Sequence, residues 1–434
     1  MSIGYWILLL LIILILSIYS LKPRNNVFKD NIYLDNNSTT PMSNEALRAY
    51  KYGAGLGNAS SSYAHEAKLI IEKNEKFVKS YLNTADLIIY TSGASESNNT
   101  ILKAVAQYYP QKHFILSSYE HKTSLECAHQ LEKDGLITLT LVKPDMYGFI
   151  HAEDVVNAIQ EDTVLVSIMH VNNEIGSIND IEHISRAIKQ RNPNIIFHSD
   201  IVQSFGKLHI PPVLDAFSVS YHKVYGPIGL GLLGIKNALF PILRAHPLIA
   251  GSQNHELRGG TLNVPAINAA YTALSNTLVN REYKNRQLLQ KKLYIVDFLR
   301  KHFAIANYSD YYQKPEEYTK NNTNQQFEIV FLGDAPNSPK MAPGTLLFNV
   351  VKFGPKKFCN IQLKKYLERH NVIISIGSAC NSDYSKASHV LFSIDCPNIC
   401  RCGIIRVSIG DENTMSEIHS FCNILLHGIY EQSR

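Results

Sequence analysis

The chain has 434 residues, 45% of them hydrophobic, and a net charge of +5 from 42 basic and 37 acidic side chains. This length allows two domains with separate cores, and the scattered basic residues exclude a nucleic-acid patch. Seven cysteines without regular spacing do not match the disulfide framework of a small secreted domain, so a reducing compartment is favoured. Cys396, Cys400 and Cys402 lack a second pair at zinc-like spacing, so no metal site is predicted.

The N-terminal segment is almost wholly apolar from Ile3 to Leu21, which is about the length needed to cross a bilayer. We expect residues 1–24 to form a single-pass membrane anchor. Lys22 and Arg24 follow the apolar stretch, so the positive-inside rule leaves the rest of the chain on the cytosolic side. The alternative is a hydrophobic helix that docks on the protein's own surface.

Short apolar runs alternate with longer helix-like stretches after the anchor, which predicts an α/β domain with a mostly parallel sheet. A cluster of polar residues follows each strand-like run. Because ligands bind outside the carboxyl ends of strands in open parallel sheets, these clusters are expected to share one site. The runs are residues 87–90, 113–116, 164–168 and 195–197.

The second half of the chain predicts a smaller α+β domain. A long amphipathic helix is expected around Ala273 to Asp297, linking the two domains, and residues 307–326 are expected to be a surface insertion. Residues 344–351 and 404–409 are strand-like, and residues 360–370 are helix-like. The expected boundaries are 30–275 for the large domain and 276–434 for the small one.

Residues 91–98 follow a strand and open a helix, with small polar side chains and free backbone N–H groups. Such a helix start can hold a phosphate at the positive end of the helix dipole, or it can be an ordinary N-cap. After the next strand, His121 offers an imidazole that can stack on a planar ring. Asn173 ends another strand with an amide that can donate to a hydroxyl or a carboxylate.

Two neighbouring strand ends carry Asp200 with Gln203, and Ser220 with His222 and Lys223. A lysine amine condenses with an aldehyde, and a carboxylate facing a pyridine nitrogen keeps that nitrogen protonated. Pyridoxal 5'-phosphate is the cofactor that needs both groups. Far downstream, residues 375–380 form a small polar run that ends at a cysteine, which is typical of an exposed nucleophile.

Together these segments resemble a cysteine desulfurase of the class V aminotransferase family, in the branch of the iron-sulfur-cluster and nitrogen-fixation desulfurases. The resemblance runs from Tyr33 to Glu417. It implies a pyridoxal-phosphate enzyme of fold type I, with a sheet of the seven-stranded type, a smaller C-terminal domain and a homodimer. The matching motifs are residues 33–41, 91–97, 120–122, 170–176, 220–227, 258–261, 375–380 and 406–410.

The resemblance also implies a role for each matching side chain. Lys223 would carry the cofactor and move protons, and Asp200 and Gln203 would pair with the ring nitrogen and the ring hydroxyl. His121 would stack on the ring. The phosphate would be bound by Ala94, Ser95, Ser220 and His222, with Thr261 from the other subunit.

Asn173 and Arg406 would hold the substrate carboxylate, although Arg406 could instead form a structural ion pair. Cys380, in a loop near residues 375–390, would attack the substrate sulfur. The implied reaction converts L-cysteine to L-alanine and leaves a persulfide on Cys380. The loop length resembles the longer-loop branch, which implies direct handover of sulfur to an acceptor such as an iron-sulfur scaffold.

Two other functions stay open from the sequence. Selenocysteine lyase uses the same cofactor chemistry, and the sequence offers no element that separates the two substrates. A catalytically idle membrane-bound adaptor is the second alternative. It rests on the anchor, on the altered stretch of residues 251–257, and on Tyr221, which stands where the family has Gly or Ala and could crowd the cofactor's phosphate.

Overall fold

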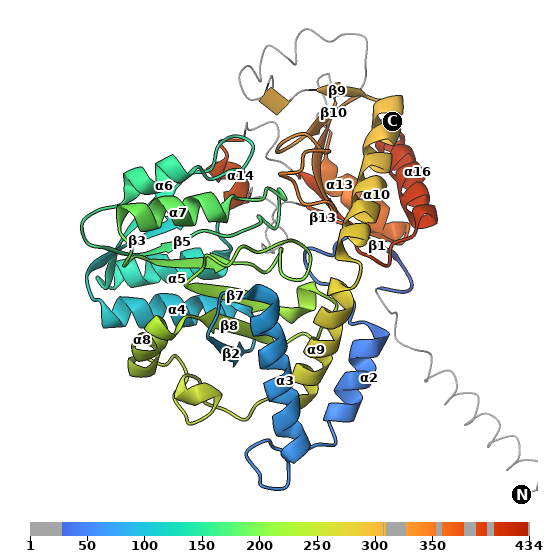
Figure 1. Cartoon of the computed structure of the whole chain (residues 1–434). Helices are drawn as coiled ribbons and strands as arrows, with labels where there is room; N and C mark the ends of the chain where they lie inside the picture. Colours follow the sequence, from blue (N-terminus) through green and yellow to red (C-terminus); the bar gives the residue numbers. More distant parts are fainter. Residues whose placement is uncertain are drawn as a thin grey trace, which may run out of the picture.

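The computed structural model of the chain describes residues 28–306, 308–309, 327–352, 358–376, 388–396 and 403–432. Within these residues, a seven-stranded sheet forms the centre of a large domain and a five-stranded sheet the centre of a smaller one (Figure 1). The predicted insertion, residues 307–326, lies almost wholly outside the described residues.

The large sheet is parallel except at β8, which runs antiparallel to both of its neighbours. The prediction of an α/β domain with a mostly parallel sheet is therefore confirmed. In spatial order the strands are β2 (Leu87–Thr91), β8 (Gly231–Ile235), β7 (Ala216–Ser220), β6 (Ile196–Asp200), β5 (Thr163–Ser167), β3 (Lys112–Ser117) and β4 (Ile137–Val142).

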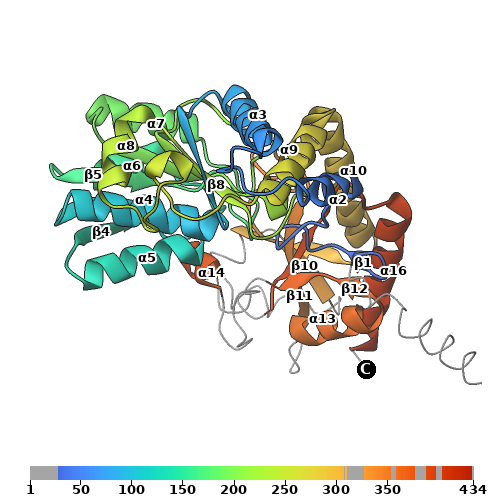
Figure 2. The same ribbon diagram turned by 90° about the horizontal axis from the view of Figure 1, so that it is seen from below.

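Helices cover both faces of this sheet, which is why its central strands are apolar on both sides (Figure 2). Successive residues of a strand point to opposite faces, so Ile115 packs in one core while Phe114 and Leu116 pack in the other. The first face carries α3 (His65–Leu82), α6 (Ala152–Ala158), α7 (Ile181–Arg191) and α9 (Val264–Leu278), with α2 (Asn44–Gly53) against α9. The second face carries α4 (Ala94–Tyr108), α5 (Lys122–Lys133) and α8 (Phe240–Ala245).

The smaller sheet and its helices enclose a separate core that includes Ile295, Phe348 and Phe421. The expected α+β composition is present here. In order, its strands are β13 (Ser375–Ile376), β14 (Ile405–Ser408), β11 (Thr345–Lys352), β10 (Phe327–Phe331) and β9 (Ala304–Ala306). Its helices are α10 (Arg281–His302), α13 (Asn360–Arg369) and α16 (Met415–Glu431).

Two elements cross the expected domain boundary. β1 (Ile32–Tyr33) pairs in parallel with β12 (Val372–Ile373), and Leu34 is buried in the small-domain core. Conversely, α14 (His389–Ser393) packs on the large domain, where Leu391 joins the core. The segment at the start of the expected large domain therefore pairs with residues much later in the chain, in the small domain.

The single linking helix expected around Ala273 to Asp297 is wrong. The chain forms α9 and α10 instead, because Val279 is extended and Asn280 adopts a left-handed conformation with φ of 54°. Asparagine tolerates this conformation better than most residues, so it can end one helix and begin another. α10 does link the domains, since Nδ2 of Asn285 near its start donates to the backbone carbonyl of Lys207 in the large domain at 2.7 Å, and Ile295 and Leu299 lie in the small-domain core.

Three short 3-10 helices complete the described secondary structure: η1 (Tyr221–Lys223), η2 (Asn237–Leu239) and η3 (Asn254–Glu256). In the described part of the chain, no helix combines the length and the apolar character that crossing a membrane requires. The expected anchor, residues 1–24, lies outside that part.

Candidate active site

A cavity of about 340 Å³ opens at the carboxyl ends of the large-sheet strands, as the strand-end clusters predicted. Ten of the predicted site residues line it together, nine of them from the large domain. They are Ala94, Ser95, His121, Asn173, Asp200, Gln203, Ser220, His222 and Lys223, and Arg406 from the small domain also lines it.

The first turn of α4 forms one end of the cavity. The backbone N–H of Ala94 donates to Oγ of Ser220 at 2.7 Å, so the helix start and the end of β7 are held together. Gly93 precedes the helix with φ of 155°, and a Cβ there would meet Oγ of Ser220 at 3.3 Å. A 15-residue helix with its N-terminus at a polar cavity is suited to binding an anionic phosphate.

Asp200 ends β6 and is buried, with only 5% of its surface exposed. Its carboxylate accepts hydrogen bonds from Nδ2 of Asn98 at 3.0 Å and from the backbone N–H of Val202 at 3.0 Å. Both donors are neutral. A buried carboxylate is stabilised best by a positive partner, so this one fits a protonated ring nitrogen in the cavity.

Lys223 lies in η1, directly after β7. Its amine donates to the backbone carbonyl of Asn37 at 2.5 Å and also to the carbonyl of Ser38. Nε2 of Gln203 donates to the same Asn37 carbonyl at 3.0 Å. The N-terminal segment thus holds the amine and the amide at one side of the cavity.

The two cavity histidines are kept neutral by their surroundings. Burial lowers the pKa of His121, and the Lys223 and His389 charges lower it further, against the opposing effect of Asp200. Burial and the Lys223 charge lower the pKa of His222 to about 4. Nδ1 of His121 accepts from the backbone N–H of Thr123, so the ring caps α5 and its orientation is fixed. A neutral, oriented imidazole can stack on a ring and exchange a proton.

Arg406 brings the small domain to the cavity. Its Nη2 donates to Asp35 at 2.7 Å and to Oγ of Ser38 at 2.8 Å, and Nη1 donates to the carbonyl of Asn173 at 3.1 Å. The structural ion pair that the sequence left open is therefore formed. The same guanidinium lines the cavity, and the carbonyl of Asn173 also accepts from Nδ2 of Asn37.

Glu120 is a buried group beside the site to which the sequence assigned no role. Its Oε1 accepts from the backbone N–H of Met169 at 2.6 Å and from the hydroxyl of Ser117. Burial raises the pKa of this carboxyl to about 8, and Asp200 raises it further, against the effects of the two hydrogen bonds. Its backbone carbonyl accepts from Nε2 of His389 at 2.8 Å, which fixes α14 beside the cavity. The position directly before His121 was the only sequence signal.

We predict that Glu120→Gln flattens the dependence of stability on pH. Because the folded-state pKa lies above the ordinary 4.5, the carboxyl contributes its full stability below that pH and loses it as the pH rises through about 8. The glutamine mimics the protonated form. Relative to wild type, the variant should therefore gain on the order of a few kcal/mol in unfolding free energy between pH 5 and pH 9.

Thermal unfolding across this pH range measures the effect. Glu126→Gln, at an exposed position of the helix α5 that begins just after Glu120, is the matched control and should follow the wild-type curve. Parallel curves for the wild type and Glu120→Gln would contradict the prediction.

One predicted site residue is not brought to the cavity in this single chain, and another lies outside the described residues. Thr261 is exposed on a loop outside it, and its contact across a dimer stays a prediction. Cys380 and the predicted loop positions 377–387 lie outside the described residues. Both described ends of that segment are fixed nearby: Ser375 pairs with Arg406, and Oγ of Ser388 donates to the cavity residue Glu174 at 2.8 Å.

The expected crowding of the phosphate side by Tyr221 is wrong. The tyrosine is fully buried in the large-domain core, where its ring meets Phe205 edge to face at 5.7 Å. It does not line the cavity. The altered stretch before Arg258 has a structural role instead, since the Asn254 side chain makes two hydrogen bonds with the backbone of Tyr90 in β2.

The cavity therefore presents a lysine amine, a buried carboxylate, an imidazole and a helix N-terminus, all facing one volume. This donor set fits pyridoxal phosphate: the amine suits the aldehyde, the carboxylate the ring nitrogen, and the helix start with Ser220 the phosphate. Val202 and Met169 add apolar lining, and Thr123 a further hydroxyl.

Comparisons with known proteins show the family of the chain. The model of the family "Aminotransferase class-V" matches residues 32–421. Cysteine desulfurase IscS of Dictyoglomus turgidum is 33% identical over 410 residues, which cover 92% of this chain and 94% of that protein. A solved NifS-like protein superposes with a TM-score of 0.75 at 27% identity, covering 92% of this chain and 98% of that one. A structure described as SspA in complex with cysteine superposes with a TM-score of 0.67 at 29% identity, covering 88% of this chain and 99% of that one.

The chain therefore belongs to the class V aminotransferase family and depends on pyridoxal phosphate. Within that family its relatives place it among the cysteine desulfurases, which confirms the resemblance found in the sequence.

Proposed function

We propose that this protein is a cysteine desulfurase that converts L-cysteine to L-alanine and passes the sulfur, as a persulfide on Cys380, to an acceptor protein. The observation that carries the proposal is the shared cavity of Lys223, Asp200, His121 and Arg406. One carboxylate and one amine are placed for the cofactor, and a guanidinium is placed for a carboxylate substrate.

The residues of the chain divide the work as follows. When bound, the cofactor supplies an electron sink for negative charge that develops on the substrate. Arg406 and the side chain of Asn173 orient the substrate carboxylate, and the Lys223 amine moves the proton at the substrate α-carbon. The neutral His121 can take up or release a second proton.

The sulfur step needs a thiolate from the chain. The Cys380 thiolate attacks the sulfur of the bound substrate, a sulfur–sulfur bond forms and the carbon–sulfur bond breaks. The electron pair of the broken bond stays with the carbon fragment, which takes up protons and leaves as alanine. The sulfur then remains on the enzyme, ready for an iron-sulfur scaffold or a thiolation acceptor.

The proposal includes a homodimer, in which Thr261 of each subunit reaches the partner's phosphate site. It also includes membrane attachment through residues 1–24, with the catalytic part on the cytosolic side because Lys22 and Arg24 follow the apolar stretch. Protease protection in sealed vesicles tests the second point: digestion of the catalytic part from the cytosolic face supports it, and protection inside the lumen contradicts it.

The test of the activity is the formation of alanine by the full-length holoenzyme, with cysteine and selenocysteine supplied separately. Alanine and sulfide formation from cysteine supports the desulfurase. Turnover of selenocysteine alone would instead make this a selenocysteine lyase, because both substrates fit the same donor set. An idle adaptor would form no alanine from either substrate; the buried position of Tyr221 removes one argument for that reading.

A further inference from the structure

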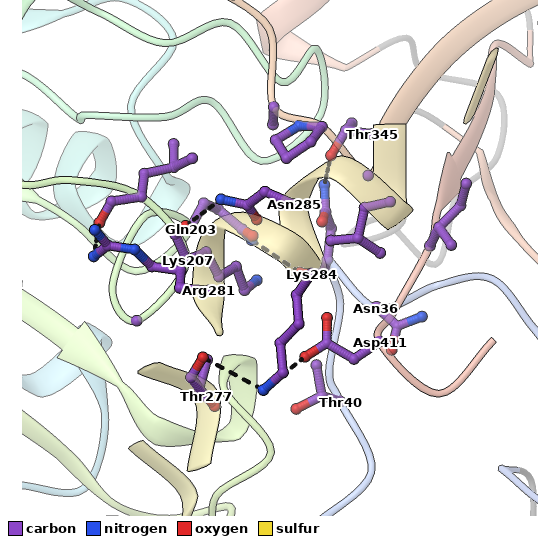
Figure 3. Close-up of a pocket in the computed structure, with 18 of the residues that line it drawn as sticks. Asn36, Thr40, Gln203, Lys207, Thr277, Arg281, Lys284, Asn285, Thr345 and Asp411 are labelled. Carbon is purple, nitrogen blue, oxygen red and sulfur yellow. Dashed lines mark hydrogen bonds and ion pairs between the residues drawn. The ribbon is translucent and has the colours of Figure 1, made fainter. Parts of the chain in front are cut away.

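A second cavity lies between the large domain, the start of α10 and the small domain, and Figure 3 shows it in close-up. Its volume is about 50 Å³, room for only a few water molecules. Asn37 and Gln203 line both this cavity and the cofactor cavity, so the two share a wall. The small domain contributes residues 342–345 and Asp411.

The lining of the second cavity carries an excess of positive charge. Three basic side chains face it, namely Lys207, Arg281 and Lys284, against the single carboxylate of Asp411. Nζ of Lys284 lies 3.8 Å from Asp411 and donates to the carbonyl of Asn276 at 2.7 Å. Nη1 of Arg281 donates to the carbonyl of Leu208 at 3.2 Å.

Lys207 is the group whose charge lacks a close partner. Its amine makes no hydrogen bond or ion pair with any residue that the structure describes, and Figure 3 shows it pointing toward Lys284 and Asp411. Burial lowers the pKa of Lys207 to about 8, against the opposing effect of Asp411. The amine thus carries much of its charge at neutral pH in a place where water cannot fully solvate it.

Asp411 cannot balance all of the surrounding cations. Burial raises the pKa of Asp411, and Lys284, Lys207 and Lys291 all act on it in the opposite direction. Burial and Asp411 also raise the pKa of Glu412, which lies beside this cluster. The two ammonium groups that line the cavity, Lys207 and Lys284, therefore share one partly desolvated carboxylate, and an uncompensated buried charge is costly.

We propose that the second cavity binds a small monovalent anion of halide size, held by Lys207 and Lys284 opposite Asp411. The cavity is too small for a phosphate ester or a nucleotide, and its charge selects an anion over a cation. Since the walls belong to both domains, the bound anion stabilises their contact. The inference concerns the folded protein and does not depend on which substrate the cofactor cavity accepts.

The first test is diffraction from crystals of the full-length holoenzyme grown with sodium bromide, using the anomalous signal of bromine. A bromide peak within hydrogen-bond distance of the Lys207 amine is the expected result. Water alone in the cavity overturns the proposal.

The second test separates a specific site from a general salt effect. Thermal unfolding of the holoenzyme is followed in chloride and in gluconate, an anion too large for the cavity, at equal ionic strength. At 0.2 M, on the order of the concentration a weak halide site needs, chloride should raise the midpoint by about 2 °C more than gluconate. Lys207→Met should lose this difference, whereas Lys133→Met, at an exposed lysine of α5, should keep it.

Asp411→Asn gives a prediction of opposite sign. The Asp411 carboxylate competes with the anion for the ammonium groups. Removing it should lower, by about tenfold, the chloride concentration that gives half of the rise in the unfolding midpoint. This variant also keeps the test decisive if Lys207→Met does not fold. An unchanged chloride response in Asp411→Asn, or a bromide peak without any difference between chloride and gluconate, would mean an adventitious ion only and would overturn the proposal.

Discussion

Lys223→Ala is expected to abolish alanine formation, with a loss of at least about 10³-fold in turnover. The amine has two proposed roles, bonding to the cofactor aldehyde and moving the proton at the substrate α-carbon. In the structure the amine lines the cavity and is oriented there by the backbone carbonyls of Asn37 and Ser38. The Lys223→Ala variant should keep the fold of η1, because the lysine side chain is not part of the core.

The measurement pairs turnover with the visible absorption of the bound cofactor. Lys223→Ala should lose the band that depends on the covalent bond, and should still retain cofactor held through the phosphate site of Ala94 and Ser220. Lys133→Ala, at an exposed position of α5, is the control and should match wild type in both. Turnover within tenfold of wild type in Lys223→Ala would show that the proposed lysine is not the catalytic one.

Cys380→Ser is expected to leave cofactor binding intact and to reduce sulfur transfer by at least about 10²-fold, because a hydroxyl does not replace a thiolate as the nucleophile. The described residues on both sides of the segment 377–387 contact residues that line the cavity. Ile376 follows Ser375, which pairs with Arg406, and four residues of chain span at most about 14 Å. By chain length alone, Cys380 therefore lies no more than about 14 Å from Ile376, beside the strand that carries Arg406.

Cys359→Ser is the matched control, since Cys359 is a free, exposed thiol at the start of α13. After addition of cysteine, the persulfide should be found by mass spectrometry on Cys380 in the wild type and in Cys359→Ser, and on no residue in Cys380→Ser. A persulfide that persists in Cys380→Ser would assign sulfur acceptance to a different cysteine. Full sulfide release without any persulfide would contradict the transfer mechanism.

Most of the cofactor site could be predicted because it depends on local order in the sequence. Asp200 and Lys223 each follow a buried strand, and parallel strands bring their carboxyl ends to one edge of the sheet. The helix start at Ala94 was readable for the same reason. The strand boundaries differed from the expected ones by only a few residues, since apolar runs buried on both faces are easy to recognise.

The errors concern the orientation of a side chain, a local break between two helices and the burial of a carboxyl group. Tyr221 was expected near the phosphate because it sits between Ser220 and His222, but η1 turns its ring into the core against Phe205. The break between α9 and α10 depends on the left-handed conformation of Asn280, which no hydrophobic period reveals. No role was predicted for Glu120, because its burial depends on the packing of the whole domain.

The sequence by itself determined the α/β class, the family, the cofactor and the order of the strand-end residues, because these follow from short periodic runs and from motifs of neighbouring residues. Only the tertiary structure decided which distant residues meet. Arg406 joins Asp35 across 371 positions, and Lys207, Lys284 and Asp411 come from three separate segments of the chain to line the second cavity. Such contacts are set by the packing of two domains against each other, and packing leaves no local period in the chain.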